Sequence, residues 1–462
     1  MNFQIEIKKT AEEFKKLSKE SVGIISHNDA DGITSAAIIS KALQRLGISF
    51  QIQFITRTED DILESIKQKK YKVFFLLDYG SKEINNIAKE NPDKTFFVLD
   101  HHPPAEIKVE RSNVFNPNPL YFGIDGGREI CGATVCYLFA KELDEKNKDL
   151  SALAIVGAIG DSQRKTGKFL GPNQEIFEQA LKDGFIVTEK GLKFYGWSSR
   201  PLHKALSYST DPFVPKISGS ESAAVQFIKE LGIPLRKEDS TWRTIRDLNE
   251  DETKKLATAL IAQRQSVEDP ANIFEEKIIL DKFNIDELKE AEALSATLNA
   301  CAKLEYFGVA LGVAMGNKDD YEKSKEIANE YKKYLIKGMN YFYDNRSNPK
   351  VVRETDNTIY FFGRDDVAGN LIGTVVTILS SQIEGKDGKA IIGFGEKNGA
   401  VKVSARFVGK RKESVDLGKL CSEISEKLGG KGGGHAVAAG ATIPAGKEEM
   451  FINAFEERVN NG

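Results

Sequence analysis

Cysteine is scarce in this sequence, and its pattern excludes two kinds of site. Four cysteines occur among 462 residues, and none is paired with another at CxxC spacing: Cys131, Cys136, Cys301 and Cys421. The pattern therefore indicates neither a disulfide framework nor a zinc site built from thiolates. We expect a protein that works in a reducing cytoplasm.

Long apolar runs and an excess of charge of either sign are also absent. The first residues, MNFQIEIKKTAEEFKK, hold no apolar segment typical of signal peptides, and the longest apolar run, near 152–159, is too short to cross a bilayer. We therefore expect a soluble protein with no membrane partner. Lys and Arg (65) nearly balance Asp and Glu (68), so contact with nucleic acid would require a local basic surface.

Length and periodicity predict several domains, the first of them α/β. A chain of 462 residues with 40% hydrophobic content is too long for a single core. The apolar segments SVGIIS, VFFLLD and TFFVLD read as strands, and helical patterns cover 34–46 and 132–143. Apolar strands that alternate with helices predict a parallel sheet. A fourth apolar segment, ALAIVGAIGD, fits either a strand or a buried helix.

Composition changes twice along the chain. Residues 194–220 are rich in Pro, Gly and Ser, which marks a loop-rich connection. Beyond 341, the segments IYFFG, AIIGFGEK and GAVKVSARFVG suggest strands, with a hairpin turn at Lys397-Asn398-Gly399 and a helix from about 417 to 428. The sequence thus predicts an N-terminal parallel-sheet domain, a linker with a helical middle region, and a smaller C-terminal α/β domain, over residues 1–200, 201–340 and 341–462.

Histidines concentrate in short acidic or glycine-rich motifs. His27 lies in HNDADG, His101 and His102 in LDHH, and His435 in GGKGGGH. Histidine suits metal ligation and proton handling near neutral pH, so this placement favours a metal-dependent site. His203 stands outside these motifs, and we expect it to pack in a core.

Polar residues follow the apolar segments of the first domain, where parallel sheets place functional residues beyond the carboxyl ends of their strands. We expect these side chains to converge on one site. The candidate ligands are His27, Asp29, Asp31, Asp78, His101 and Asp161. A set of imidazoles and carboxylates without thiolate favours Mn²⁺ or Mg²⁺ over structural zinc. Four carboxylates balance two divalent ions, and two such ions can hydrolyse a phosphate ester.

Each of these motifs also has an ordinary structural interpretation. An Asp at a strand end is often a helix cap or a turn former, and a single His is more often packed than bound to metal. Several such ends, each finishing in a potential ligand, favour the metal site.

The C-terminal domain carries a second candidate site. GGKGGGH fits either a C-cap turn after a helix or a cradle in which backbone N–H groups approach a phosphate, with His435 adding a hydrogen bond or a proton. Ser404 and Arg406 alternate on the expected strand KVSARF and so share one face. Arg406 could bind a phosphate through two parallel hydrogen bonds or remain an exposed surface residue.

The motifs HNDADG, LLDYG, LDHH and GAIGD, in that order, resemble those of the DHH phosphoesterase superfamily. KVSAR followed by GGKGGGHAVAAGA is similar to the associated DHHA1 substrate domain. The length, the DADG form of the first motif and the segment RPLHKALSYSTDPFVPKISG most resemble archaeal RecJ-like exonucleases, including GINS-associated nucleases. The resemblance implies a DHH catalytic domain, a DHHA1 domain and an active site in the cleft between them.

The resemblance also implies roles for the candidate residues. His27, Asp29 and Asp78 would hold one Mn²⁺, with Mg²⁺ or Co²⁺ as alternatives. Asp31, Asp78, His101 and Asp161 would hold a second cation, with Asp78 as the ligand that bridges the two. His102 would meet the scissile phosphate, which makes Asp78, His102 and Asp161 the expected catalytic residues.

Binding of the substrate's phosphate backbone is implied for the C-terminal domain, through Ser404, Arg406, Gly432, Gly433, Gly434 and His435. The implied activity is exonucleolytic hydrolysis of single-stranded DNA, RNA or both, in DNA replication or repair. The GINS complex and the replicative helicase are the implied partners.

Two other functions remain open. The first is an oligoribonuclease or nucleotide phosphatase of the same superfamily, a group whose members are usually shorter than this chain. The second is a scaffold that binds GINS, which loss of ligands would favour, although all six ligand positions are filled here. The sequence decides neither the polarity of degradation, nor the choice between DNA and RNA, nor the oligomeric state.

Overall fold

The computed structural model describes residues 2–17, 20–55, 59–105, 111–164, 167–209, 212, 214–264, 273–383, 388–397, 399–409 and 415–460. The chain divides into two compact units, Met1–Lys325 and Glu326–Gly462. The domain boundaries expected near residues 200 and 340 stay predictions. Among the described residues, no helix combines the length and apolar character needed to cross a membrane.

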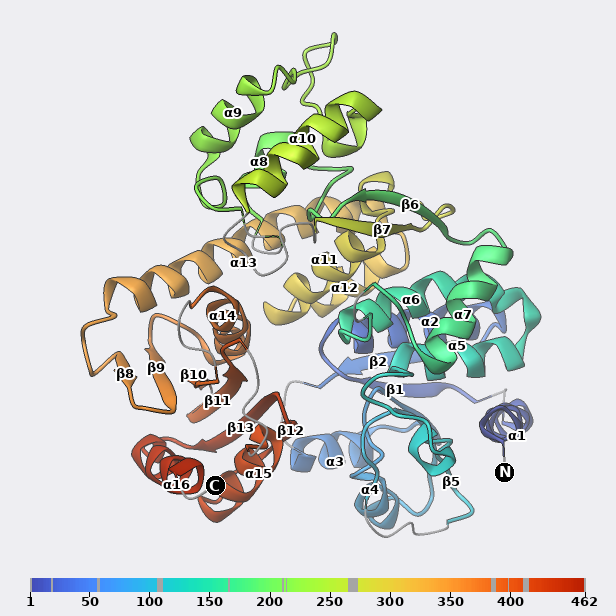
Figure 1. Ribbon diagram of the computed structural model, residues 1–462. Helices are drawn as coiled ribbons and strands as arrows, with labels where there is room; N and C mark the ends of the chain where they lie inside the picture. The colour runs from blue at the N-terminus through green and yellow to red at the C-terminus, as the bar shows by residue number, and fades with distance from the viewer. Residues whose placement is uncertain are drawn as a thin grey trace. The chain divides into compact units, whose positions relative to one another are not determined.

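The first unit is built on a five-stranded sheet of order β2-β1-β3-β4-β5, in which every neighbouring pair is parallel (Figure 1). The strands are β1 Val22–Ser26, β2 Phe50–Phe54, β3 Val73–Leu77, β4 Thr95–Leu99 and β5 Val114–Phe115. Ser26 pairs with Leu77, and Leu77 with Leu99. The three central strands therefore end level with one another, and the residues that follow them emerge at one edge of the sheet.

Aromatic side chains of the central strands alternate between the two faces of this sheet, since successive residues of a strand point in opposite directions. Phe74 and Phe96 pack on one face with α3 Glu59–Gln68 and α4 Ile84–Glu90. On the other face, Phe75 and Phe97 contact Phe14 of α1 (Phe3–Lys16) and Phe139 of α5 (Gly132–Leu143). Strands covered on both faces read as continuous apolar runs, as these do.

The helices α1 Phe3–Lys16, α2 Ala30–Arg45, α5 Gly132–Leu143, α6 Ser151–Gly160 and α7 Gly171–Lys182 complete this α/β region. The segment ALAIVGAIGD, for which strand and helix were both open, belongs to the helix α6. Because α6 packs on both α2 and α5, it is apolar on all sides and its sequence has no amphipathic period.

The middle region is mostly helical and has its own core. It contains β6 Val187–Leu192, α8 Leu202–Ser207, α9 Glu221–Glu230, α10 Glu250–Gln263, β7 Phe274–Ile279, α11 Ala291–Lys303 and α12 Phe307–Ala314. Strands β6 and β7 form an antiparallel pair. His203 is buried in α8 with its ring centroid 4.7 Å from that of Trp242, which agrees with the expectation that it packs.

Short 3₁₀ turns occur both in the α/β region and in the middle region. They are η1 Pro119–Phe122, η2 Glu145–Leu150, η3 Ile245–Asp247 and η4 Asp286–Leu288.

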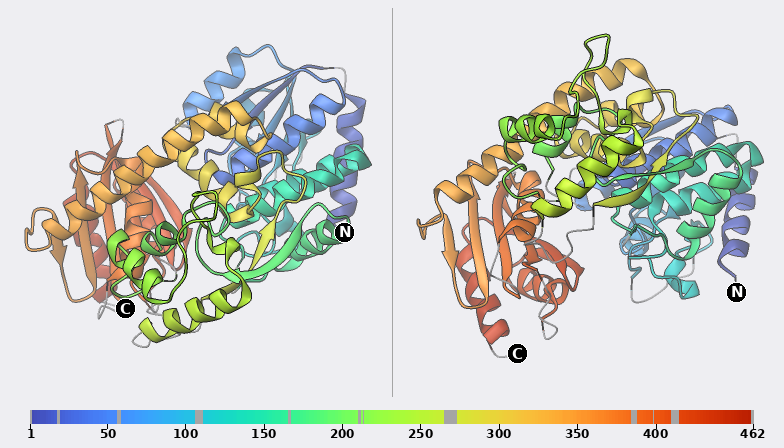
Figure 2. Two further views of the ribbon diagram at one scale, coloured as in Figure 1. Left: turned by 90° about the horizontal axis from the view of Figure 1, so that it is seen from above. Right: turned by 45° about the horizontal axis from the view of Figure 1, so that its top comes forward.

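The second unit contains a mixed six-stranded sheet of order β12-β13-β11-β10-β9-β8. Its strands are β8 Val352–Glu354, β9 Thr358–Arg364, β10 Ala390–Lys397, β11 Ala400–Phe407, β12 Lys431–His435 and β13 Ala438–Pro444. Its helices are α14 Gly369–Gln382, α15 Leu417–Lys427 and α16 Glu448–Asn460. Figure 2 shows α13, Lys318–Asp344, as one long helix in orange that leads into this unit.

Two expectations for the second unit have different outcomes in the structure. Strands β10 and β11 pair in an antiparallel hairpin around Lys397 and Gly399, whereas Asn398 lies outside the described residues. The alternative that GGKGGGH is only a turn after the helix is wrong, because Lys431–His435 form the edge strand β12. Pairing of β12 with β13, with Gly433 opposite Gly440, satisfies backbone hydrogen bonds and so offsets the large entropic cost of ordering a glycine-rich segment.

The packing of α1 predicts a large loss of stability for Phe14→Ala. Phe14 is fully buried between Phe75, Phe97 and Phe139, so its truncation should lower the free energy of unfolding by about 3–5 kcal/mol. Urea denaturation followed by tryptophan fluorescence measures this change. Ile5→Ala on the same helix is the control: Ile5 is 51% exposed, and a change of no more than about 0.5 kcal/mol is expected. Equal losses in the two variants would contradict this packing.

Candidate metal centre

The residues that directly follow three strands form part of the candidate site. His27 follows β1, Asp78 follows β3 and Asp100 follows β4, and backbone hydrogen bonds from His27 N to Leu77 O (3.1 Å) and from Asp78 N to Leu99 O (2.9 Å) continue the ladder past the strands. Asp78 has φ 53°, a left-handed conformation that is costly for most non-glycine residues and recurs at functional sites. The backbone is thus held so that the Asp78 carboxylate points into the cluster.

The turn between β1 and α2 positions the first two aspartates. Asp29 is the N-cap of α2: its Oδ1 accepts a hydrogen bond from Gly32 N (3.0 Å), and its Oδ2 lies 3.0 Å from His27 Nδ1. A Cβ atom at Gly32 would lie 2.2 Å from His27 O. The glycine of HNDADG is therefore required by the close approach of the two backbone segments.

Asp31 joins the site from the first turn of α2. It is buried and accepts hydrogen bonds from Gly132 N (2.7 Å) and Ala133 N (2.8 Å) at the N-terminus of α5, where unpaired N–H groups and the helix dipole favour an anion. A Cβ atom at Gly132 would lie 2.6 Å from Asp78 Cβ, so a residue with a side chain here would displace Asp78.

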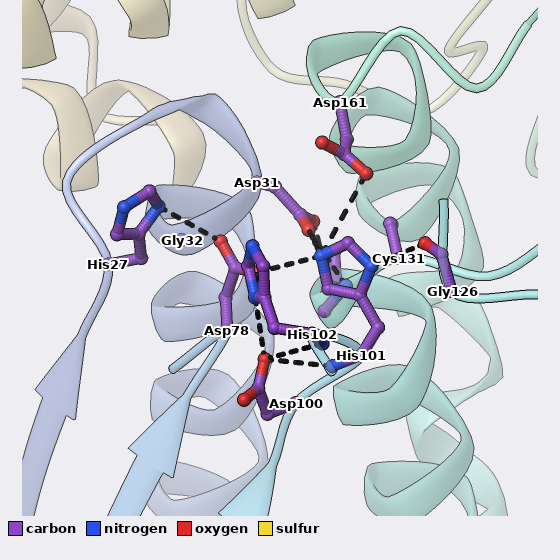
Figure 3. A network of polar contacts seen from close by, with 12 residues as sticks. His27, Asp31, Gly32, Asp78, Asp100, His101, His102, Gly126, Cys131 and Asp161 are labelled. Carbon is purple, nitrogen blue, oxygen red and sulfur yellow. Dashed lines mark hydrogen bonds and ion pairs between the residues drawn. The ribbon is translucent and has the colours of Figure 1, made fainter. Parts of the chain in front are cut away.

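His101 and His102 have different partners and face different surroundings. His101 is buried; its Nδ1 lies 2.6 Å from Gly126 O and donates to that carbonyl, which leaves Nε2 to face the carboxylates (Figure 3). His101 Nε2 lies 3.1 Å from Asp78 Oδ1, 3.7 Å from Asp31 Oδ2 and 3.8 Å from Asp161 Oδ2.

His102 is oriented by Asp100. The Asp100 carboxylate accepts hydrogen bonds from the backbone N–H groups of Ser81, His101 and His102, and Oδ1 lies 2.8 Å from His102 Nδ1. Since Nδ1 is directed at Asp100, the other ring nitrogen of His102 lies on the far side of a half-exposed ring. That nitrogen is free to interact with a bound molecule.

Asp161 follows the last residue of α6 rather than a strand. It is the C-cap of that helix, and Figure 3 shows its carboxylate directed from the helix end toward His101. A buried helix and the central strands therefore deliver ligand candidates to the same place.

Burial and mutual repulsion set opposite protonation tendencies within the cluster. Burial, together with repulsion from Asp78, raises the pKa of Asp31 well above its usual value. Burial also raises the pKa of Asp161 to about 6, against the attraction of His101. Burial opposes ionisation of Asp78, but the neighbouring His101 and His27 outweigh it and lower the pKa of Asp78. Without a cation, protons must supply the positive charge that this site demands.

The two histidines that face the carboxylates show the same competition. Burial lowers the pKa of His27, but the charge of Asp29 and the neighbouring Asp78 outweigh it, so the net pKa is raised well above its usual value. The same balance, with Asp78 as the main partner, raises the pKa of His101. The field of the site is thus strongly negative and favours bound cations.

Two buried polar atoms of the cluster favour a bound cation. Within the described part of the chain, His27 Nδ1 and Asp78 Oδ1 have no partner in hydrogen-bond geometry, although charged groups lie close to both. Buried polar atoms without hydrogen bonds are rare, and a bound ion is one explanation for them. Three groups each bring their ligand atoms within 4.8 Å of one another: His27, Asp29 and Asp78; Asp31, His101 and Asp161; and Asp78, His101 and His102. All six expected ligands therefore lie together and fit divalent cations in both donor type and number.

The expected substrate residues lie in the second unit. Ser404 and Arg406 share a face of β11, as expected, with Arg406 Nη1 3.4 Å from Ser404 Oγ. Gly432, Gly433 and Gly434 belong to β12, and a Cβ atom at Gly433 would meet no heavy atom within 4 Å. The backbone of His435 ends this strand, and its side chain is outside the described set.

Arg406 is held by neutral groups. Its Nε donates to Thr377 Oγ1 (3.1 Å), and its Nη1 donates to the backbone carbonyls of Ala405 (2.8 Å) and Ala439 (3.2 Å). Among described residues, no carboxylate lies within ion-pair distance of this guanidinium, and burial lowers its pKa. A partly buried positive charge without a counterion favours an anionic ligand.

Sequence reasoning assigned no role to several groups that shape the site. Asp100 belongs to the motif LDHH, but its function as the acceptor that orients His102 was not predicted. Gln163 and the carbonyl of Gly126 also contact ligand candidates. No pattern marks a backbone carbonyl or a single glutamine as functional, so these contacts become visible only in three dimensions.

Comparison with known protein families matches three segments of the chain. The DHH family N-terminal domain matches residues 21–160, the DHH-CID domain matches 194–277, and the DHHA1 domain matches 355–461. The first match contains all the candidate ligands except Asp161, and the third contains the expected substrate residues.

One similar protein and two solved structures cover nearly the whole chain. An uncharacterized protein, MJ0831 of Methanocaldococcus jannaschii, is 30% identical over 444 residues, which span 94% of this chain and 92% of that protein. CDC45 from Entamoeba histolytica has a TM-score of 0.63 at 11% identity, with 98% of this chain and 97% of that chain covered. RecJ from Thermus thermophilus, solved with Mn²⁺, has a TM-score of 0.57 at 15% identity, over 99% of this chain and 55% of that chain.

The two structural likenesses concern the fold, whereas the sequence matches establish the family. The conclusion is that this chain belongs to the DHH/DHHA1 superfamily and has a RecJ-like fold, with DHH, DHH-CID and DHHA1 domains in that order.

Proposed function

We propose that this protein is a metal-dependent exonuclease that hydrolyses phosphodiester bonds of single-stranded DNA, RNA or both. One observation carries the proposal: two ligand groups, His27-Asp29-Asp78 and Asp31-His101-Asp161, lie next to each other, with His101 Nε2 3.1 Å from Asp78 Oδ1, and the first contains two buried atoms that lack hydrogen-bond partners. Membership of the DHH/DHHA1 superfamily supports phosphoesterase activity in general.

Two divalent cations would occupy the site. His27, Asp29 and Asp78 would hold one, and Asp31, Asp78, His101 and Asp161 would hold the other, with Asp78 shared. The donors favour Mn²⁺, with Mg²⁺ and Co²⁺ as alternatives. Bound there, such a pair supplies an activated water and stabilises the departing oxygen of a phosphate ester.

The chain's own side chains orient the reacting groups. Gly126 O keeps the Nδ1 proton of His101 in place, so that Nε2 presents its lone pair to the ligand cluster. Asp100 does the same for His102, whose far nitrogen would donate a hydrogen bond or a proton to the scissile phosphate. The charge-assisted contact to Asp100 raises the pKa of His102 despite its burial, which favours the donor form.

Phosphate binding away from the reacting bond would fall to the second unit. Arg406 has a guanidinium that neutral groups hold in place, with its charge unpaired among the residues described, and Ser404 lies beside it. The open space beside Gly433 would allow a phosphate to approach the backbone of β12. That the substrate lies in a cleft between the two units stays a prediction, as do roles in replication or repair and the binding of GINS.

The first prediction concerns the cations alone. The purified, chelator-treated protein should bind two Mn²⁺ ions per chain, and Asp78→Asn should weaken binding at least about tenfold, since even residues that only support a ligand change affinity by about 10–100-fold. Isothermal titration and electron paramagnetic resonance of free Mn²⁺ measure both quantities. Asp93→Asn is the control, because Asp93 is an exposed partner of Lys72. This variant should bind two Mn²⁺ ions with the affinity of the wild-type protein. Undiminished binding by Asp78→Asn would contradict the ligand assignment.

The second prediction concerns the reaction. End-labelled single-stranded DNA and RNA of several lengths should be shortened with Mn²⁺ and left intact with EDTA. Asp78→Ala should lower the rate by more than about 10²–10³-fold, the loss seen when a single group that stabilises the transition state is removed. Gel analysis of the products also shows the polarity. Cleavage of only the shortest oligomers would favour the small-substrate alternative, and cleavage of none by the metal-loaded protein would favour the scaffold.

The third prediction concerns Arg406. In an Asp78→Asn background, where strands bind without being cut, Arg406→Ala should weaken binding of single-stranded DNA and reduce the salt slope by about 0.7, the value for one lost phosphate contact. Fluorescence anisotropy at several salt concentrations measures this slope. Arg353→Ala serves as the control, because Arg353 is paired with Glu449 and should leave the slope unchanged. An unchanged slope in the Arg406 variant would show that Arg406 makes no contact with a phosphate of the substrate.

A further inference from the structure

The turn after α6 brings two side chains to the same side. Ser162 N donates to Ile159 O (3.0 Å) and Gln163 N donates to Ala158 O (2.9 Å), the paired hydrogen bonds of a Schellman motif. Ser162 occupies the left-handed position with φ 58°, where glycine is usual. The reversal turns the chain back, so that Asp161 and Gln163 approach each other rather than pointing apart.

The amide of Gln163 is buried and has partners on both sides. Gln163 is 2% exposed. Its Nε2 lies 2.7 Å from Asp161 Oδ2, 2.8 Å from Gly126 O and 3.0 Å from Ile130 O, and its Oε1 accepts from Asn173 Nδ2 at 2.6 Å. This is a dense set of contacts for a side chain that the family motifs do not include.

Only one orientation of the amide is compatible with these partners. Backbone carbonyls cannot donate, so the nitrogen of Gln163, and not its oxygen, must face Gly126 and Ile130. Asn173 fits this choice: its Oδ1 accepts from the Thr134 hydroxyl (2.6 Å), which leaves its nitrogen to donate to Gln163. The donor that faces Asp161 is therefore determined by the surrounding polar network.

The same carbonyl connects Gln163 to a second ligand candidate. Gly126 O accepts from His101 Nδ1 (2.6 Å) and from Gln163 Nε2 (2.8 Å), so both of its lone pairs are used. Figure 3 shows Gly126 beside the His101 ring, with Asp161 directed toward the same ring from the end of α6. Gln163 thus contacts the oxygen of Asp161 that faces His101 and also the carbonyl that orients His101.

We propose that Gln163 is a positioning residue that holds Asp161 and His101 in the arrangement required by one cation. Among the described residues, its side-chain hydrogen bonds are to Asp161, Gly126, Ile130 and Asn173, and none is to His27 or Asp29. Loss of Gln163 should therefore weaken one of the two cations and leave the other unchanged. The proposal rests on the proposed metal centre, but it needs no particular nucleic-acid substrate.

The test uses Gln163→Met, which keeps the length and approximate volume of the side chain and removes the donor, and Gln163→Glu, which replaces the donor by an acceptor. Gln174→Met on α7 is the matched control, because Gln174 is only partly buried and its side chain donates to the exposed Glu178, on a helix other than those that carry the ligand candidates. Circular dichroism and the urea midpoint confirm folding of each variant. Stoichiometry and the two dissociation constants for Mn²⁺ are then measured with the full-length chain by isothermal titration and electron paramagnetic resonance.

In the Met variant, one Mn²⁺ should bind about 10–100-fold more weakly, as for other residues that support metal ligands, while the other keeps its affinity. The lost kcat should return as Mn²⁺ is raised, with KM for the nucleic acid unchanged, a response that a general loss of folding would not give. If Gln163→Met fails to fold, the same comparison is made with Gln163→Glu.

Two results would overturn the inference: wild-type affinity for both cations in a folded variant, or equal weakening of both cations. Failure of the wild-type protein to bind two cations would instead refute the proposed metal centre. The two failures are therefore distinguishable in one set of titrations.

Discussion

Repulsion among four neighbouring aspartates is the constraint on which the rest of the site depends. Asp29, Asp31, Asp78 and Asp161 are brought together where burial makes each charge expensive. The fold offsets this cost locally, with the N-terminus of α5 at Asp31 and the amide of Gln163 at Asp161. These contacts hold the carboxylates in place but do not neutralise them. The remaining negative charge gives the site its demand for cations.

The sheet explains why the charges meet at all. Because β1, β3 and β4 end in register, these three neighbouring strands deliver His27, Asp78 and Asp100 to one edge of the sheet. Apolar packing on both faces holds those strands, with Phe74 and Phe96 on one side and Phe75 and Phe97 on the other. The hydrophobic core thus supplies the rigidity that a set of mutually repelling ligands needs.

Much of this arrangement could be predicted from the sequence because the informative patterns are local. An apolar run followed by Asp or His marks a strand end at Ser26 or Leu77 without knowledge of its neighbours, and the parallel topology then implies convergence. Asp161 shows where this reasoning stops. The period of ALAIVGAIGD could not separate strand from helix, since α6 is packed by other helices and carries no polar face.

The sequence by itself determined the order of the strands and helices around the motifs, the chemical identity of the ligand candidates and the superfamily, because these depend on residue type and short spacing. Only the tertiary structure decided that GGKGGGH pairs as an edge strand, that Asp100 orients His102, and that Gln163 joins Asp161 to the carbonyl beside His101. Each of these depends on partners distant in sequence or on a backbone carbonyl. Every residue carries such a carbonyl, so its role is set by where the chain folds and not by which amino acid it is.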